Sequence, residues 1–409
     1  MKNVFPFLLL LFVALISACS APEKSFENGI WRGMMVTDSA VNIPFNFEVY
    51  DSAGTKQVAF INGKERLNIN QVITSGDSVI IRTPMYETEI KAVLTEEGMR
   101  GEWVRVLPER EQRMPFTASP NTSWRFAASA GQPIASVEGR WSVVFRKAGS
   151  VDSTLAIGEF RQAGAQVSGT FLTNFGDYRF LSGEMDGNAF SMSSYAGASP
   201  ILFEGTLQGE TIRGRMYSGP ANQSTWEAHK DDNAALEDAY QISRLKPGAK
   251  LAFEFVDTEG NKVSLADERF QNKVVVIQFL GSWCPNCMDE TAFLSPFYKK
   301  YRGKGLEIIG LAYERYAEPE KAKKAVKNLM DRFDVTYPVL LTGYSNRPGQ
   351  VLESLPALES FSAFPTTIIL NKQGEVYSIH SGFDGPATGD AYDRYIASFE
   401  ATINTLISQ

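Results

Sequence analysis

Residues 273–287 have the sequence KVVVIQFLGSWCPNC, in which a run of apolar residues ends at two cysteines separated by two residues. Four β-branched residues in succession, Val274 to Ile277, are typical of a strand that is buried on both faces. Pro285 suits the first turn of a helix, where the N–H group that proline lacks would have no partner. The stretch therefore predicts a buried strand over residues 273–280 and a helix from Pro285 to about Tyr301.

Strands and helices alternate through the sequence around this stretch. A hairpin-like start is predicted near residues 251–257. Further strands are predicted at residues 306–312, 337–341, 365–371 and 376–382. Further helices are predicted at residues 319–333, 350–361 and 390–407. This order predicts an α/β domain over residues 247–409.

The two cysteines stand on the first turn of the predicted helix. At positions i and i+3 they can close a disulfide, and the positive end of the helix dipole favours a thiolate at Cys284. We expect Cys284 to be the exposed nucleophile. Cys287, one turn deeper, would be the thiol that resolves a mixed disulfide.

Other uses of the cysteine pair are less compatible with the sequence. A zinc site would need a second ligand pair, but the chain has one further cysteine, Cys19, and two histidines. A c-type haem site would need histidine where Met288 stands. A purely structural disulfide remains the alternative. We therefore predict neither a metal nor a cofactor.

Residues 247–409 resemble the TlpA/ResA kind of membrane-tethered thiol-disulfide oxidoreductases, which have the thioredoxin fold. Four spaced features carry the resemblance. They are the apolar strand, the motif Trp283-Cys284-Pro285-Asn286-Cys287, Glu290 three residues beyond the second cysteine, and Phe364-Pro365-Thr366-Thr367 before another apolar strand. A lone pair of cysteines would be a weak signal, and the agreement of four features makes it a strong one.

The resemblance implies roles for several residues. Pro365 would follow a cis peptide bond beside the disulfide, and the backbone of Phe364 would be offered to a substrate strand. Phe364 is bulkier than the residue that this family usually carries there. Trp283 and Thr366 are further candidate substrate contacts.

Glu290 is implied to handle protons near the cysteines. The helix dipole also favours a carboxylate in the first turns of a helix, and both explanations stay open. Gln278 stands six residues before Cys284, where thioredoxins proper carry a buried acid. Because glutamine cannot ionise, Glu290 is the candidate replacement for that acid.

The N-terminal sequence predicts a targeting signal. Lys2 precedes an apolar run from Val4 to Ile16, which is too short to span a bilayer and suits a signal-peptide core. The ending Ile16-Ser17-Ala18-Cys19 resembles a bacterial lipobox. It implies a signal peptide at residues 1–18, a lipid on Cys19 and a tether over residues 19–27. An ordinary secretory signal with a chance cysteine is the alternative.

Residues 28–230 are predicted to be antiparallel β structure, because short alternating runs are separated by turn signals about every ten residues. Gly29-Ile30-Trp31 recurs as Gly139-Arg140-Trp141, which suggests two related units. Chance similarity between glycine-rich strands is the alternative, and the choice between barrel and sandwich stays open. The predicted parts are a β unit at residues 28–120, a second at 136–230, and a linker at 231–246.

Composition and motifs together favour one function. A net charge of −7 argues against a nucleic-acid-binding protein. We expect a lipid-anchored thiol-disulfide oxidoreductase in the cell envelope, facing the periplasm or the surface and reducing disulfides through Cys284 and Cys287. The resemblance implies protein or small-molecule disulfides as substrates and a thiol-reducing membrane protein as electron donor.

Two other functions remain open. One is a ligand-binding envelope lipoprotein in which residues 28–230 carry the function. The other is a thiol peroxidase, which is disfavoured because Gly281 stands where peroxiredoxins place threonine or serine.

Overall fold

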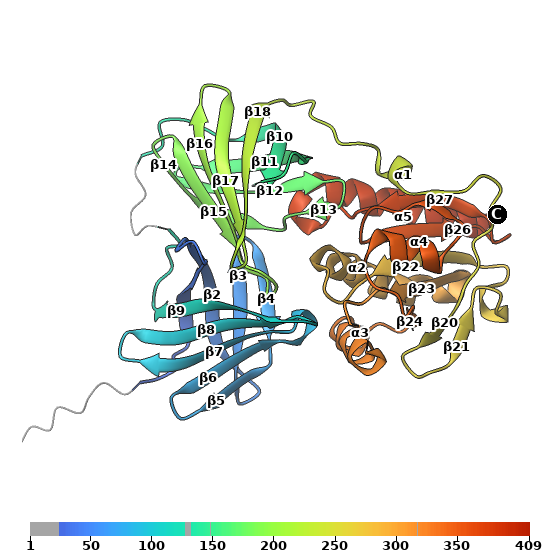
Figure 1. The fold of residues 1–409 in the computed structure, drawn as a ribbon, viewed down its shortest axis with the longest axis horizontal. Coiled ribbons are helices and arrows are strands. Elements are labelled where there is room, and N and C mark those ends of the chain that lie inside the picture. The colour runs from blue at the N-terminus through green and yellow to red at the C-terminus, as the bar shows by residue number, and fades with distance from the viewer. Residues whose placement is uncertain (1–23, 127–131, 148, 317) are drawn as a thin grey trace, which may run out of the picture.

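The structure is a computed structural model that describes residues 24–126, 132–147, 149–316 and 318–409. The predicted signal peptide and Cys19 lie outside the described residues. An antiparallel all-β region of two barrel-like sheets comes first and an α/β domain follows it (Figure 1), which confirms the expected fold class. Within the described ranges, no helix is both long enough and apolar enough to cross a membrane.

The first sheet contains nine antiparallel strands. They are β1 (Gly29–Val36), β2 (Asn42–Ser52), β3 (Thr55–Asn62), β4 (Glu65–Ile69), β5 (Val72–Ser75), β6 (Ser78–Thr83), β7 (Thr88–Thr95), β8 (Gly98–Val106) and β9 (Glu111–Pro120). Their order in the sheet is β4-β3-β2-β1-β9-β8-β7-β6-β5. A short 3-10 turn, η1 (Pro84–Tyr86), lies between β6 and β7. Alternate residues face a core that includes Trp31, Phe45 and Trp103.

The second sheet closes on itself. Its strands are β10 (Gly139–Lys147), β11 (Ser153–Ala163), β12 (Gln166–Thr173), β13 (Gly176–Asp177), β14 (Leu181–Asp186), β15 (Ala189–Ser194), β16 (Ile201–Gln208), β17 (Thr211–Ser218) and β18 (Asn222–Lys230). Their order is β11-β10-β18-β17-β16-β15-β14-β12-β13, and β11 also pairs with β12. That extra pairing makes a barrel, which the sequence had left undecided.

The repeated sequence motif has the same local structure in both sheets. Gly29 and Gly139 each begin a first strand with positive φ, at 129° and 109°. The indole N–H of Trp31 donates to the carbonyl oxygen of Glu27, four residues earlier, over 2.9 Å. The indole of Trp141 makes the same bond over 2.8 Å, also to a carbonyl four residues earlier. In both units, therefore, the glycine turns the chain and the tryptophan anchors it to the barrel.

The α/β domain is built on a seven-stranded sheet. Its strands are β20 (Glu254–Asp257), β21 (Lys262–Ser264), β22 (Val274–Leu280), β23 (Leu306–Ala312), β24 (Val339–Leu341), β26 (Thr366–Leu370) and β27 (Val376–Ser381). Its helices are α2 (Pro285–Tyr301), α3 (Pro319–Phe333), α4 (Pro348–Ser354) and α5 (Asp390–Ser408), with the 3-10 turns η2 (Glu268–Phe270), η3 (Arg302–Lys304) and η4 (Pro386–Thr388). The strand order is β21-β20-β24-β23-β22-β26-β27.

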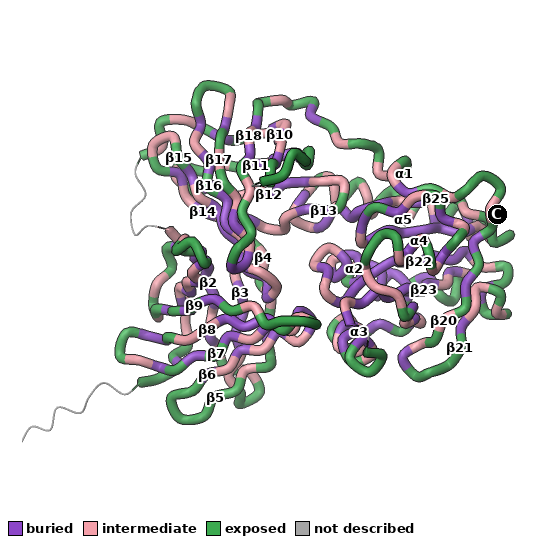
Figure 2. The backbone as a smooth tube through the Cα atoms, in the orientation of Figure 1, coloured by how far each residue is buried: buried purple, intermediate pink, exposed green. Residues whose placement is uncertain are grey.

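The central strand β22 is buried along its whole length (Figure 2). Val274 and Val276 belong to the core shared with α2, α3 and α5, whereas Val275 and Ile277 belong to the core shared with α4. Because both faces are covered, the apolar run is continuous rather than alternating.

Two predicted helices differ from the observed ones. The helix expected over residues 350–361 ends at Ser354, and β25 (Leu358–Ser360) then pairs with β19 (Arg244–Leu245). Pro356 explains the early end, since a residue that precedes proline is disfavoured in a helix. The helical turn expected near residues 234–240 forms later, as α1 (Ala239–Ile242), because the Asp238 side chain accepts the N–H of Tyr240 and caps it.

Buried charges join the β region to the α/β domain. Arg179, just after β13, forms ion pairs with Glu65 of β4 and Asp289 of α2, and none of the three side chains is more than 14% exposed. Met85 and Tyr86 of η1 add an apolar contact, since they belong to the same core as α2. Both sheets are therefore held against the helix that begins at the cysteine pair.

Candidate functional site

The cysteine pair lies where β22 ends and α2 begins. Cys284 and Cys287 form a disulfide, with their Cα atoms 5.3 Å apart. Cys284 is the N-cap residue of α2, and the N–H group of Cys287 donates to the Cys284 Sγ over 3.2 Å. The first sulfur therefore sits at the positive end of the helix dipole, beside N–H groups that have no carbonyl partner within the helix.

A cis peptide bond lies beside the disulfide. It joins Phe364 and Pro365, as the resemblance implied, and the carbonyl oxygen of Phe364 lies 3.6 Å from the Cys284 Sγ. The Phe364 ring packs edge-on against Trp283 at 5.5 Å between ring centroids. The indole N–H of Trp283 in turn donates to the carbonyl oxygen of Tyr313 over 2.9 Å. Trp283 and Phe364 thus flank the first sulfur.

Thr366 does not offer its side chain to a substrate. It is buried, and its hydroxyl donates to the carbonyl oxygen of Ala363 over 2.8 Å. This hydrogen bond holds the cis-proline loop in shape. The expected substrate contact at Thr366 is thus wrong for the side chain.

The first cysteine is less accessible than the sequence suggested. Cys284 is 4% exposed and Cys287 is 0% exposed, so the expectation of an exposed Cys284 is wrong in this structure. The turn between β12 and β13 of the second sheet packs beside the cysteine pair. Asn286, between the two cysteines, donates from Nδ2 to the carbonyl oxygen of Phe175 in that turn, over 3.4 Å.

The same turn also rests on the loop that follows β27. Gly382 packs closely against the backbone of Asn174. Its N–H group donates to the carbonyl oxygen of Pro365 over 2.8 Å. A Cβ at Gly382 would come within 2.8 Å of the Asn174 carbonyl oxygen, so only glycine leaves room for the turn. The β12–β13 turn is therefore fitted to the surface around the cysteine pair and the cis-proline loop. It comes from residues about a hundred positions earlier in the chain, so local patterns could not reveal it.

Glu290 sits in a buried polar network one turn beyond Cys287. One carboxylate oxygen accepts the amide of Gln278 over 2.8 Å, and the other accepts the hydroxyl of Thr367. Tyr337 donates to the carbonyl oxygen of the Gln278 side chain over 3.2 Å. Burial raises the pKa of Glu290 to about 7, although the two hydrogen bonds oppose the shift. Gln278, at the position where the resemblance implies a buried acid in thioredoxins, thus contacts Glu290 directly.

Comparison with known proteins places this geometry in a family. A family model described as Redoxin matches residues 246–395. Thiol-disulfide oxidoreductase ResA of Bacillus subtilis is 30% identical over 150 residues, which cover 37% of this chain and 74% of that protein. The same-named protein of Bacillus cereus is 31% identical over 142 residues, covering 35% of this chain and 70% of that protein. The chain belongs to the ResA family of thiol-disulfide oxidoreductases.

Membership rests on the C-terminal part of the chain. A thiol:disulfide interchange protein of the thioredoxin family from Chlorobium tepidum aligns with 40% of this chain and 99% of its own, at 19% identity and a TM-score of 0.30. By its family model and its curated relatives, the ResA-family domain is a thiol-disulfide oxidoreductase of thioredoxin fold, as the resemblance implied. The relatives above do not extend over the β region.

Sequence reasoning missed two buried carboxyls near the ResA-family site. Glu314 follows β23 and accepts both the N–H and the hydroxyl of Ser282, at 2.7 and 2.6 Å. Asp177 accepts the N–H of Gly385 over 2.8 Å. Burial raises the pKa of each carboxyl to about 7. Glu314 could have been found, because the C-terminal ends of parallel strands β22 and β23 meet at one sheet edge. Asp177 left no local signal.

His380 packs between two tyrosines. Its ring lies 4.8 Å from both Tyr240 and Tyr395, between ring centroids. Burial lowers the pKa of His380 to about 4, so the ring is neutral near pH 7. Among the described residues, no group of three or more His, Cys, Asp or Glu side chains could hold a metal ion.

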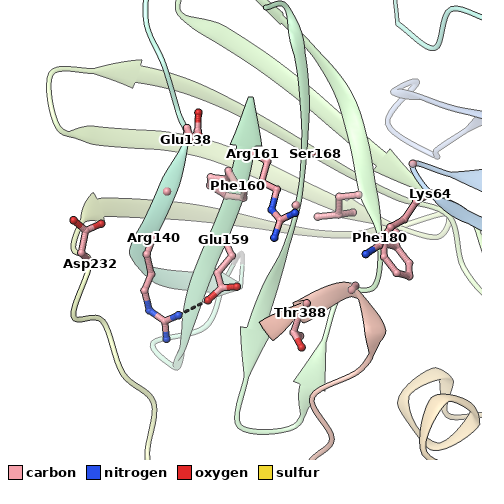
Figure 3. Close-up of a pocket in the computed structure, with 16 residues that line it drawn as sticks. Lys64, Glu138, Arg140, Glu159, Phe160, Arg161, Ser168, Phe180, Asp232 and Thr388 are labelled. Carbon is pink, nitrogen blue, oxygen red and sulfur yellow. Dashed lines mark hydrogen bonds and ion pairs between the residues drawn. The ribbon is translucent and has the colours of Figure 1, made fainter. Parts of the chain in front are cut away.

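A cavity of about 560 Å³ lies away from the cysteines, between the second barrel and η4 (Figure 3). Arg140 and Glu159 form an ion pair on its wall, and Arg161 and Thr388 also line it. None of the predicted site residues lines this cavity.

The raised pKa of Glu290 predicts a pH-dependent stability. Its carboxyl titrates near 4.5 when unfolded and near 7 when folded, so its contribution to the folded state falls as pH rises between these values. Between about pH 5 and pH 8, the free energy of unfolding of the oxidised protein should fall by about 2–3 kcal/mol more than that of Glu290→Gln. Urea unfolding across this range measures the difference.

The matched control for this measurement is Glu210→Gln, which makes the same change at an exposed residue. Its pH profile should follow that of the wild type. Parallel profiles for wild type and Glu290→Gln would contradict the raised pKa.

Proposed function

We propose that the chain is a lipid-anchored, extracytoplasmic thiol-disulfide oxidoreductase that reduces disulfides through Cys284 and Cys287. The observation that carries the proposal is the position of the pair. The first sulfur caps α2 and contacts the carbonyl oxygen of the residue before cis-Pro365, over 3.6 Å. Family membership of residues 246–395 supports the same activity.

The proposed reaction begins from the dithiol. The Cys284 thiolate, stabilised by the helix dipole and by the N–H of Cys287, attacks one sulfur of the substrate disulfide. A mixed disulfide forms and one substrate thiolate leaves. Cys287 then loses its proton and attacks the Cys284 sulfur, which releases the second thiolate and closes the protein disulfide.

Glu290 is the proposed proton acceptor for Cys287. It lies three residues further along α2 and is buried, so bulk water does not compete with it. A carboxyl with a pKa of about 7 exchanges protons readily near neutral pH. Gln278 and Thr367 hold the carboxylate in place without supplying a charge.

Three further features of the proposal rest on sequence and family. The lipobox-like ending at Cys19 supports a lipid anchor and a position in the cell envelope. Resemblance to membrane-tethered oxidoreductases supports a thiol-reducing membrane protein as electron donor. Protein or small-molecule disulfides are the proposed substrates.

Removal of the resolving thiol should trap the mixed disulfide. In Cys287→Ser, Cys284 can attack a disulfide but nothing displaces the product, so a covalent adduct accumulates. Non-reducing electrophoresis of the full chain after incubation with insulin should show this adduct, and dithiothreitol should release it. Insulin reduction should fall to the rate given by dithiothreitol alone.

Cys284→Ser is the matched control for trapping, because it removes the attacking sulfur from the same helical turn. It should form no adduct. An adduct in Cys284→Ser but none in Cys287→Ser would reverse the assigned roles.

The reduction potential decides the direction of the reaction. A reductase should have a potential between those of thioredoxin and protein disulfide isomerase, about −270 to −180 mV. Equilibration of the full chain with thiol redox buffers, read by tryptophan fluorescence, gives this value. A potential close to that of DsbA, about −120 mV, would make the protein an oxidant and overturn the reductase direction.

Lipid attachment at Cys19 is tested in bacteria that express the whole chain. Wild type should incorporate labelled palmitate and sediment with membranes, because acylation adds the hydrocarbon that holds it there. Cys19→Ala should lose both properties, whereas Ser20→Ala should keep them. Labelling that persists in Cys19→Ala would show that the cysteine is not the acceptor.

A further inference from the structure

A cavity of about 460 Å³ opens beside the redox pair, between the β region and the ResA-family domain. Trp283 and Pro285, the two neighbours of Cys284, both line it. Phe175 and Tyr178 of the second barrel form part of the opposite wall. A ligand in this cavity would therefore touch the residues on either side of the attacking sulfur. The volume of the cavity suits a small molecule.

Two arginines give the cavity a positive charge. Arg105 of β8 and Arg315, just beyond β23, both line it, and among the described residues neither has a carboxylate within 4.0 Å. Arg105 is only 8% exposed. Its Nη1 donates to the Ser199 hydroxyl over 3.0 Å, whereas its Nε is buried without a partner in the described part of the chain. Arg315 lies 4.9 Å above the centre of the Trp283 ring.

The other charges around the cavity do not cancel this pair. Arg179 also lines it but is already paired with Glu65 and Asp289. Asp177 is occupied by the N–H groups of Arg179 and Gly385.

Glu314, which precedes Arg315 in the chain, and Glu87 stabilise the charge of Arg315 from a distance, and Glu87 does the same for Arg105. The Glu87 carboxylate accepts the hydroxyl of Tyr316. Burial lowers the pKa of Arg105 to about 10, and the like charge of Arg315 adds to the effect. A buried charge without a bound counter-ion is costly, so the site favours an anion.

We propose that this cavity binds a low-molecular-weight disulfide that bears carboxylates, with Arg105 and Arg315 holding a carboxylate while the sulfur–sulfur bond faces Cys284. The guanidinium fork matches the two oxygens of a carboxylate. Cys284 is only 4% exposed, which favours a small substrate over a folded protein. The inference rests on the proposed function and names the substrate class of that site.

The overall reaction is balanced by the protein itself. The Cys284–Cys287 dithiol gives two electrons and two protons to the substrate, which becomes two thiols, and the protein becomes the disulfide. In the assay dithiothreitol restores the dithiol. The arginines take no part in bond making, so they act as specificity residues.

The first arm of the test measures binding without redox chemistry. Suberate has two carboxylates joined by a chain as long as that of dithiodipropionate, but it has no sulfur. Calorimetry should show that suberate binds the oxidised full chain and that Arg105→Gln and Arg315→Gln each weaken binding by roughly tenfold, the scale of one charge-assisted hydrogen bond. Arg100→Gln, an exposed arginine of the same strand β8, is the matched control and should bind as wild type.

The second arm measures reaction of the reduced full chain with dithiodipropionate, neutral hydroxyethyl disulfide and cationic cystamine, by stopped-flow tryptophan fluorescence. The dianion should react faster than the neutral disulfide, and cystamine more slowly. The ratio of the dianion rate to the neutral rate should fall roughly tenfold in Arg315→Gln, by loss of one charged contact. Arg315 is only half-buried, so this variant serves if Arg105→Gln does not fold.

Each outcome separates the inference from the proposed function. Absence of suberate binding, or equal binding in the arginine variants and wild type, overturns the inference. A rate ratio that is the same in wild type and Arg315→Gln also overturns it, while the redox function stands. If the reduced chain reacts with none of the three disulfides, the redox function fails, and the suberate arm still decides whether the cavity is an anion site.

Discussion

The ion cluster of Arg179 with Glu65 and Asp289 is the contact on which the arrangement of the site depends. It joins the first sheet, the second barrel and helix α2 at one buried point. Removing Arg179 would leave two buried carboxylates without a counter-charge, at a cost of about 3–5 kcal/mol. A buried ion pair contributes little net stability compared with apolar packing, so its value here is positional. It fixes where the β region sits relative to the helix that carries the disulfide.

The position of the β region controls access to the cysteine pair, whose chemistry otherwise depends on nearby residues alone. The first sulfur depends only on the start of α2 and on the cis-proline loop, which both lie within the ResA-family domain. The β12–β13 turn packs on Asn286 and Gly382 beside the cysteine pair, and a cavity lined by two arginines opens next to it. A common redox centre thus acquires its own substrate space from the sheets packed against it, without any change in the centre itself.

The buried polar network around Glu290 also combines residues from distant parts of the chain. Gln278 comes from β22, Glu290 from α2 and Thr367 from β26, and the three meet in a buried network. Because Gln278 is an amide, the network contains one carboxyl group, that of Glu290, rather than two. Because two buried carboxylates would repel each other, this arrangement keeps the titration of Glu290 simple.

The sequence by itself determined the α/β domain, the buried strand, the place of the cysteine pair at the start of α2 and the β character of residues 28–230. These features depend on local patterns: a continuous apolar run, a proline at the first helical position, and regular turn signals. Only the tertiary structure decided that Cys284 is covered, that the second sheet closes into a barrel, and that Arg105, Arg179 and Arg315 gather around the redox face. Each depends on contacts between residues far apart in the chain, and single-sequence periodicity carries no information about which surfaces meet. The helix expected to continue to residue 361 failed for a local reason that was visible, Pro356, whereas the burial of Cys284 had no local reason at all.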